Sequence, residues 1–319
     1  QRICATGFEL LRQAAEQLRD EAQLVLCVAS ESMSRNPIAA YTHRDGFRLG
    51  GAVQFKDFLW EALYDPAPGL DMIATADNLA RRHGLSREAV DRYARDSHQR
   101  ALQAQRDGAW VDEIVTVDNQ VFELEGYRPR GISLARRADA VTEDSHPRST
   151  TLAALARLRA VHPDGVQTAG NSCAVVDGAA AALVGRASAC TRPALARLLA
   201  SAVVGVAPEF MGIGPVPAIR LLLQRSGLSL DDIGRFEINE AQAAQVLAVV
   251  QELELDSGRL NVQGGSLGLG HPLAATGLRL VMTLARQLRA HNLRYGIAAA
   301  CVGGGQGMAL LIENPAYRA

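Results

Sequence analysis

One short sequence unit occurs twice in this chain, at widely separated positions. The first copy reads CATGFELLRQAAEQLR from Cys4, and the second reads AATGLRLVMTLARQLR from Ala274. Aligned without a gap, the copies share Ala-Thr-Gly, one Leu, one Ala and Gln-Leu-Arg, and an apolar run follows each. Because self-similarity of this kind indicates a repeated structural unit, the chain is predicted to fold as two related halves. One copy begins with a cysteine and the other follows Gly-His-Pro, so a nucleophile and a base would meet where the halves join.

The bulk composition limits the class of protein. The 319 residues are enough for two modest domains, and a formal net charge of −1 argues against nucleic-acid binding, which usually needs a basic surface. The most apolar stretch, residues 198–219, contains Glu209 and three prolines, so no membrane span is expected.

The cysteines point to a reducing compartment. There are five, with no CxxC pair, which fits neither a disulfide framework nor a zinc site. A cytoplasmic location without a bound metal is therefore predicted. Cys27 and Cys190 are expected to be small buried hydrophobic residues.

Strand and helix patterns alternate along much of the chain, which indicates the α/β class. Apolar periodicity predicts helices over 8–19, 73–83, 86–106, 215–224, 241–252 and 273–290, with Ser86 as an N-cap. Strands are predicted over 23–29 (buried), 110–117, 193–206, 235–238, 295–301 and 308–313. The polar, irregular region from about Glu31 to Gly170 is interpreted as an insertion into the first half.

Four positions are candidates for chemistry. Cys4 lies at a predicted helix N-terminus, where the helix dipole should lower the thiol pKa. His271 also precedes a helix, and Cys301 ends a strand just before Gly303–Gly305, whose backbone N–H groups could face a ligand. Asn239 is either a helix N-cap or a carboxamide aimed into a cleft. Each has an alternative structural role, but together two thiols and an imidazole indicate acyl transfer followed by proton abstraction.

Seven blocks of the chain resemble the thiolase family, in the family's order. They are QRICATG, ESMSRNP, TAGNSCAVVDGAAA, MGIGPVPAIR, INEAQAAQ, GGSLGLGHPLAATG and CVGGGQG. The resemblance implies a five-layered α/β/α/β/α fold of two similar halves with an inserted loop domain. Residues 1–34 with 171–190 would form the N-terminal half, 35–170 the loop domain, and 191–319 the C-terminal half. About the first quarter of a typical thiolase has no counterpart, so we expect the N-terminal half to be incomplete and an upstream segment to exist.

The resemblance also implies catalytic roles. Cys4 would attack an acyl-CoA thioester and hold the acyl group, and His271 would activate Cys4. Cys301 would move the proton at the α-carbon of acetyl-CoA. Asn239 would hold a water that forms one oxyanion site with His271, and the backbone N–H groups of Cys4 and Gly303 would form the other.

Six further positions are implied to contact the acyl group or coenzyme A. Gln242 replaces the aromatic residue of the family's Asn-Glu-Ala-Phe, and Cys173 replaces a serine that touches pantetheine. Such changes are expected to alter substrate contacts and to leave the chemistry intact. The positions are Met211, Ala241, Gln242, Cys173, Arg148 and His162, the last two lying where the family covers the adenine of coenzyme A.

The function implied is that of a thiolase of fatty acid metabolism, such as β-oxidation. It would cleave 3-oxoacyl-CoA reversibly to acyl-CoA and acetyl-CoA, as a homodimer or homotetramer, with coenzyme A as substrate and no permanently bound cofactor. Two alternatives stay open: a non-catalytic CoA-binding paralogue, and an acetyl-CoA acetyltransferase that works mainly in Claisen condensation. The sequence does not choose an acyl chain length.

Overall fold

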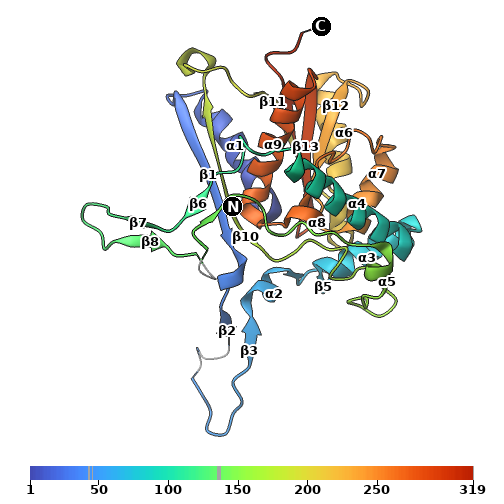
Figure 1. The fold of residues 1–319 in the computed structure, drawn as a ribbon. Helices are drawn as coiled ribbons and strands as arrows, with labels where there is room; N and C mark the ends of the chain where they lie inside the picture. The colour runs from blue at the N-terminus through green and yellow to red at the C-terminus, as the bar shows by residue number, and fades with distance from the viewer. Residues whose placement is uncertain (42–43, 45, 135–137, 319) are drawn as a thin grey trace.

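Two β-sheets enclose a pair of helices in the computed structural model, which describes residues 1–41, 44, 46–134 and 138–318 (Figure 1). The first sheet has two antiparallel strands, and the second has four, in the order β11-β14-β13-β12, of which only β12 and β13 run parallel. The predicted α/β class is confirmed. The strands are β1 (Leu24–Ser32), β10 (Asp177–Gly185), β11 (Arg197–Gly205), β12 (Ile233–Ile238), β13 (Tyr295–Val302) and β14 (Gln306–Glu313).

Helices α1 and α9 lie between the two sheets, and α6 and α7 cover the other face of the four-stranded sheet. Within the described residues the layers therefore run β/α/β/α. The outward side chains of the two-stranded sheet are exposed, and Leu26 of β1 is 67% exposed. Residues of β1 therefore alternate between buried and exposed, and the prediction that this strand is buried throughout is wrong. The helices are α1 (Thr6–Gln17), α6 (Pro215–Ser226), α7 (Ala243–Leu253) and α9 (Leu273–Ala290).

Among its described residues, the long region between β1 and β10 contains four α-helices and four short antiparallel strand pairs. Two of these pairs, β2–β3 and β7–β8, project from the body (Figure 1). The helices are α2 (Phe58–Ala62), α3 (Met72–His83), α4 (Arg87–Arg106) and α5 (Leu152–Ala156). The pairs are β2 (Ile38–Ala40) with β3 (Phe55–Asp57), β4 (Tyr64–Asp65) with β5 (Leu70–Asp71), β6 (Val117–Asp118) with β9 (Ala140–Val141), and β7 (Gln120–Phe122) with β8 (Arg130–Ile132).

Further short helices within the described residues are η1 (Ile3–Ala5), η2 (Met33–Arg35), η4 (Ala187–Ala189), η5 (Pro208–Ile213) and α8 (Ser266–Leu269). The predicted N-cap of α4 is present, since the Ser86 hydroxyl accepts a hydrogen bond from the Ala89 N–H at 3.2 Å. None of the helices in the described part of the chain is long and apolar enough to cross a membrane.

The two copies of the repeated unit touch at their glycines. Gly7 lies on α1 and Gly277 on α9. A Cβ added to Gly7 would come within 2.3 Å of the backbone N of Leu278, and one added to Gly277 within 2.5 Å of the backbone N of Phe8. Because neither glycine has a side chain, the two helix backbones approach directly. This contact brings together the N-terminal ends of both helices, where Cys4 and His271 lie.

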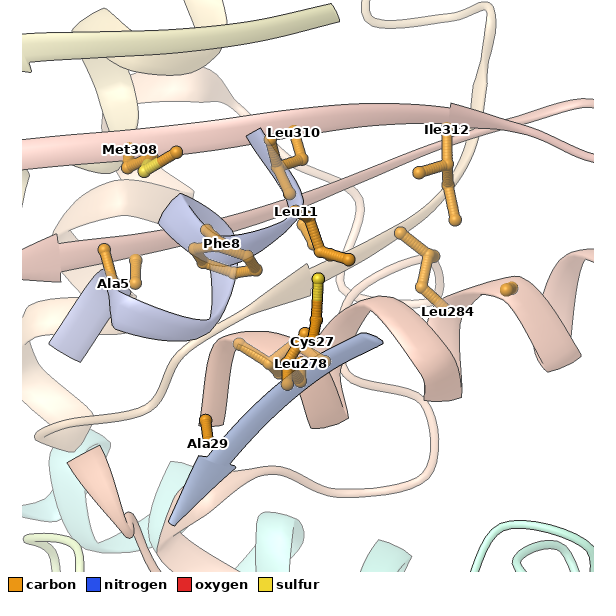
Figure 2. Close-up of a cluster of buried hydrophobic side chains, with 14 of the residues drawn as sticks. Ala5, Phe8, Leu11, Cys27, Ala29, Leu278, Leu284, Met308, Leu310 and Ile312 are labelled. Atoms are coloured by element: carbon orange, nitrogen blue, oxygen red, sulfur yellow. The ribbon is translucent and has the colours of Figure 1, made fainter. Parts of the chain in front are cut away.

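The main core surrounds this helix pair. Figure 2 shows Phe8 and Leu11 of α1 between the β14 side chains and Cys27 of β1, with Leu278 of α9 beside them. Cys27 is 2% exposed, and its thiol lies 3.6 Å from the carbonyl oxygen of Leu10, which confirms that it is a small buried core residue.

Two local predictions are wrong. Residues 110–113 form turns and 114–116 are irregular rather than a strand, because Trp110 packs against Ala101 and Ala104 of α4 and its carbonyl accepts the N–H of Ile114 at 2.8 Å. Cys190 is exposed, since it follows η4 on the surface between β10 and β11.

Candidate functional site

Cys4 lies in a strained turn at the start of α1. The preceding Ile3 has φ +43°, an unfavourable value for a β-branched residue. Thr6 supports the turn, because its hydroxyl accepts the Arg2 N–H at 2.9 Å and donates to the Ile3 carbonyl at 2.8 Å. Strain of this kind concentrates at functional sites, where the surrounding structure imposes it.

The turn after β13 approaches Cys4 from the other half. The backbone N–H of Gly303 is directed at the Cys4 sulfur. Cys301, fully buried at the end of β13, packs against Met211 and Ala241. Gly305, with φ +79°, closes the turn, and a Cβ there would lie 2.4 Å from the Val206 carbonyl oxygen. The glycines of CVGGGQG therefore permit both the turn and the close approach of an N–H to the thiol.

His271 is held between two side chains in the interior. Asn239 Nδ2 lies 3.2 Å from His271 Nε2, and Thr276 Oγ1 lies 2.6 Å from His271 Nδ1. Asn239 follows β12, and α7 begins only at Ala243, so Asn239 is not the N-cap that the sequence left as an alternative. Its carboxamide is instead aimed at the imidazole.

Burial keeps the groups of this site neutral. It raises the pKa of the Cys4 thiol to about 11, against the lowering effect of the Gly303 N–H. The sequence predicted a lowered pKa, which is wrong because desolvation outweighs the N–H groups at the helix start. Burial, followed by the positive charge of Arg279, lowers the pKa of His271 to about 3. The site thus holds a neutral thiol and a neutral imidazole.

Alkylation of Cys4 in the free protein should follow this raised pKa. The thiolate is the reactive form, so the rate with iodoacetamide is expected to rise about tenfold per pH unit from pH 7 to 9. The rate is measured by mass spectrometry of the Cys4 peptide, with the exposed Cys190 as an internal control for reagent access. A Cys4 rate that levels off below about pH 8 would contradict the raised pKa.

One cavity adjoins Cys4, and a second adjoins Ser172, the residue before Cys173. One, of about 190 Å³, is lined by Cys4, Gly303, Met72 and the segment 62–66. The other, of about 280 Å³, is lined by His98, His146, Arg148, Thr150, Ala154, Leu155, Leu158, Ala169, Gly170 and Ser172. The first cavity thus opens onto the Cys4 thiol, and the second reaches as far as Ser172.

Comparison with known proteins gives consistent matches along the chain. Residues 1–188 match the family model described as thiolase, N-terminal domain, and residues 192–314 match thiolase, C-terminal domain. The chain belongs to the thiolase family. It is 38% identical to the human mitochondrial 3-ketoacyl-CoA thiolase, over 99% of this chain and 78% of that protein. It is 39% identical to an acetyl-CoA acetyltransferase of Pseudomonas aeruginosa, over 98% and 78%.

Solved thiolase structures have the same fold. The crystal structure of the human mitochondrial 3-ketoacyl-CoA thiolase in complex with CoA superposes with a TM-score of 0.90, covering 98% of this chain and 76% of that one at 38% identity. An acetyl-CoA acetyltransferase of Bacillus anthracis gives 0.87. The predicted family and its α/β fold are confirmed.

Four of the predicted substrate-contact positions of this thiolase lie in two neighbouring segments. Met211 and Ala241 lie against Cys301. Cys173 donates its backbone N–H to the Ala241 carbonyl at 3.0 Å, and the neighbouring Ser172 forms a β-bridge with the buried Gln242. Met211 and Ala241 thus contact the Cys301 side chain, and Cys173 is joined to Ala241 by a backbone hydrogen bond.

Arg148 and His162, the two positions predicted near the adenine of coenzyme A, have different surroundings. Arg148 lines the larger cavity. His162 instead contacts the Asp71 carboxylate, with Nε2 2.9 Å from Oδ2, at the start of α3. The same carboxylate caps α3 through the Ala74 N–H at 2.8 Å.

Sequence reasoning missed the side chains that orient the catalytic candidates. Thr276 belongs to the repeated Ala-Thr-Gly, and its place five residues after His271 is a usable signal. Ser266 lies inside the GGSLGLGHP block, but a lone serine gives no pattern. His98 was also missed, since it appears in an ordinary helical stretch.

Proposed function

We propose that this thiolase catalyses the reversible CoA-dependent cleavage of 3-oxoacyl-CoA to acyl-CoA and acetyl-CoA. The observation that carries the proposal is the Gly303 backbone N–H directed at the buried Cys4 thiol, which interacts with the second buried thiol, Cys301. The neutral imidazole of His271 precedes α9, the helix whose backbone touches that of α1 after Cys4. Each step of this reaction is assigned a group: Cys4 for the attack, the Gly303 N–H for the C3 oxygen, and the His271–Asn239 pair for the enolate oxygen.

Cleavage begins when His271 accepts the Cys4 proton and the sulfur attacks C3 of the substrate. The C3 oxygen is held by the N–H groups of Cys4 and Gly303. The C2–C3 bond breaks, its electron pair forms an enolate of acetyl-CoA, and the enolate oxygen faces His271 and Asn239. Cys301 then gives its proton to C2, and acetyl-CoA leaves.

Acyl transfer completes the cycle. Coenzyme A gives its thiol proton to the Cys301 thiolate and attacks the acyl group on Cys4. Acyl-CoA leaves, and the Cys4 sulfur recovers its proton from His271. Burial and the charge of Cys4 raise the pKa of Cys301 well above its ordinary value, so the thiolate left after it protonates C2 is a strong base toward the coenzyme A thiol.

The larger cavity suits the phosphate-bearing end of coenzyme A. Arg148 is the one charged residue among the described residues that line it, because burial lowers the pKa of His98 to about 4 and that of His146 as well. The Arg148 backbone N–H lies 3.4 Å from His98 Nδ1, and its guanidinium donates to His146 Nδ1 at 3.2 Å. Arg148 is thus fixed where it can pair with phosphate.

The lining of this cavity includes the residue that precedes Cys173. Ser172 lines it and is followed by Cys173, whose backbone bonds Ala241 beside Cys301. The remaining lining residues are mostly small and apolar, which suits a pantetheine arm. The crystal structure of a relative in complex with CoA supports coenzyme A as the substrate.

The test is an assay of acetoacetyl-CoA and a series of longer 3-oxoacyl-CoA substrates with free coenzyme A. Acetoacetyl-CoA is expected to give two acetyl-CoA, and the longer substrates acetyl-CoA with the shortened acyl-CoA. Binding of coenzyme A without any of these products would select the non-catalytic alternative. Rates in both directions decide between degradative and synthetic use. The homodimer or homotetramer and the cytoplasmic location stay predictions.

A further inference from the structure

A chain of hydrogen bonds links Arg279 to the catalytic imidazole. Arg279 Nη2 lies 3.3 Å from Ser266 Oγ, and Ser266 Oγ lies 2.7 Å from Asn239 Oδ1. Asn239 Nδ2 then reaches His271 Nε2 at 3.2 Å. Ser266 and Asn239 are fully buried and His271 is 2% exposed, so bulk water does not compete for these bonds.

The guanidinium fixes the direction of the first bond in this chain, and the Ser266 hydroxyl, which donates to Asn239 Oδ1, fixes the direction of the others. A guanidinium can only donate, so the Ser266 oxygen accepts from Arg279 and its single hydrogen is free for Asn239 Oδ1. With Oδ1 engaged, Asn239 must present Nδ2 to the imidazole. His271 Nε2 is therefore an acceptor, and Nδ1–H donates to Thr276 Oγ1 at 2.6 Å.

Both ends of the chain are anchored. The Thr276 hydroxyl donates to the Pro272 carbonyl at 3.2 Å. Arg279 Nη1 lies 3.6 Å from Oε2 of the buried Glu237 carboxyl group without a hydrogen bond, and the other oxygen of that group accepts from Gln287 at 2.9 Å. The Ser266 hydroxyl therefore links the Arg279 guanidinium to the Asn239 amide.

We propose that Ser266 is a positioning residue that sets the orientation of the Asn239 amide. The inference rests on the proposed function, in which Asn239 and His271 face the enolate oxygen. Without the Ser266 hydroxyl, Asn239 Oδ1 loses its donor and the amide is free to rotate. A rotated amide places an oxygen against His271 Nε2 and withdraws the N–H donor from the enolate site.

Replacement of Ser266 by alanine separates this role from a general packing role. Cleavage of acetoacetyl-CoA needs the enolate site, whereas exchange of acetyl groups between acetyl-CoA and labelled coenzyme A makes no carbon–carbon bond change. We expect S266A to lower kcat for cleavage about tenfold and the exchange rate clearly less, because exchange uses His271 on Cys4 but not the enolate site, with the KM for coenzyme A unchanged. S266C, which keeps a weak donor of similar size, should give an intermediate kcat.

Thr283→Val is the matched control. Thr283 donates a buried hydrogen bond to Glu113 Oε1 at 2.5 Å from the same helix as Arg279, but it is outside the chain that reaches His271. T283V should leave both rates unchanged. The inference is overturned if S266A cleaves at the parental rate, or if it loses cleavage and exchange in equal proportion. A parent chain that exchanges and cleaves nothing overturns the proposed function itself.

Discussion

Replacement of Cys4 by alanine is expected to lower thiolysis of 3-oxoacyl-CoA by about 10⁶-fold, the scale seen when a covalent nucleophile is removed. The acyl group then has no acceptor, and the remaining thiols do not substitute. Cys301 lies behind Met211 and Ala241, and burial raises the pKa of Cys173 to about 12. Steady-state cleavage of acetoacetyl-CoA measures the loss, and mass spectrometry of the protein after incubation with acetyl-CoA shows whether an acyl-enzyme forms.

The control for this variant is Cys190→Ser. Cys190 is exposed, so its replacement should keep full activity and the parental acyl-enzyme. The fold of C4A is checked by its circular dichroism and melting temperature, because Cys4 is 8% exposed and its removal leaves a small cavity. A C4A protein that is folded and retains more than about 1% of parental turnover would exclude Cys4 as the acyl carrier.

Replacement of Gly7 by alanine is expected to destabilise the protein by about 3 kcal/mol or more, because the new methyl group would overlap a neighbouring backbone. Its Cβ would lie 2.3 Å from the Leu278 backbone N and 2.9 Å from Gly277. No side-chain movement can relieve this contact, so α1 and α9 would have to separate. Cys4 and His271 lie at the ends of these helices, and activity should fall together with stability.

The sign of this effect is a strict test, because helix propensity alone predicts the opposite. Within an α-helix, alanine is more favourable than glycine by about 1 kcal/mol. Urea unfolding measures the change, and Gly205→Ala is the control, since a Cβ at Gly205 meets nothing within 4 Å. Unfolding of G7A at or above the parental urea midpoint would show that the two repeated units do not touch as described.

Much of the site could be predicted from the sequence because its information is local. The Cys4, His271 and Cys301 segments each keep a short motif, and the repeated unit placed two of them on equivalent helices. Helical periodicity located α4 and α9 within a residue or two, and the Ser86 cap followed from side-chain chemistry. The strand predicted at 110–117 failed because the burial of Trp110 against α4 overrode local alternation.

The sequence by itself determined the family, the α/β class and the identity of the candidate catalytic groups, since motifs and periodicity lie within short stretches of chain. Only the tertiary structure decided the protonation of Cys4, the orientation of the Asn239 amide through Ser266, and the contact of Gly7 with Gly277. Each of these depends on desolvation or on a partner from a distant segment. Such quantities sum over groups that meet only after folding, so no local pattern contains them.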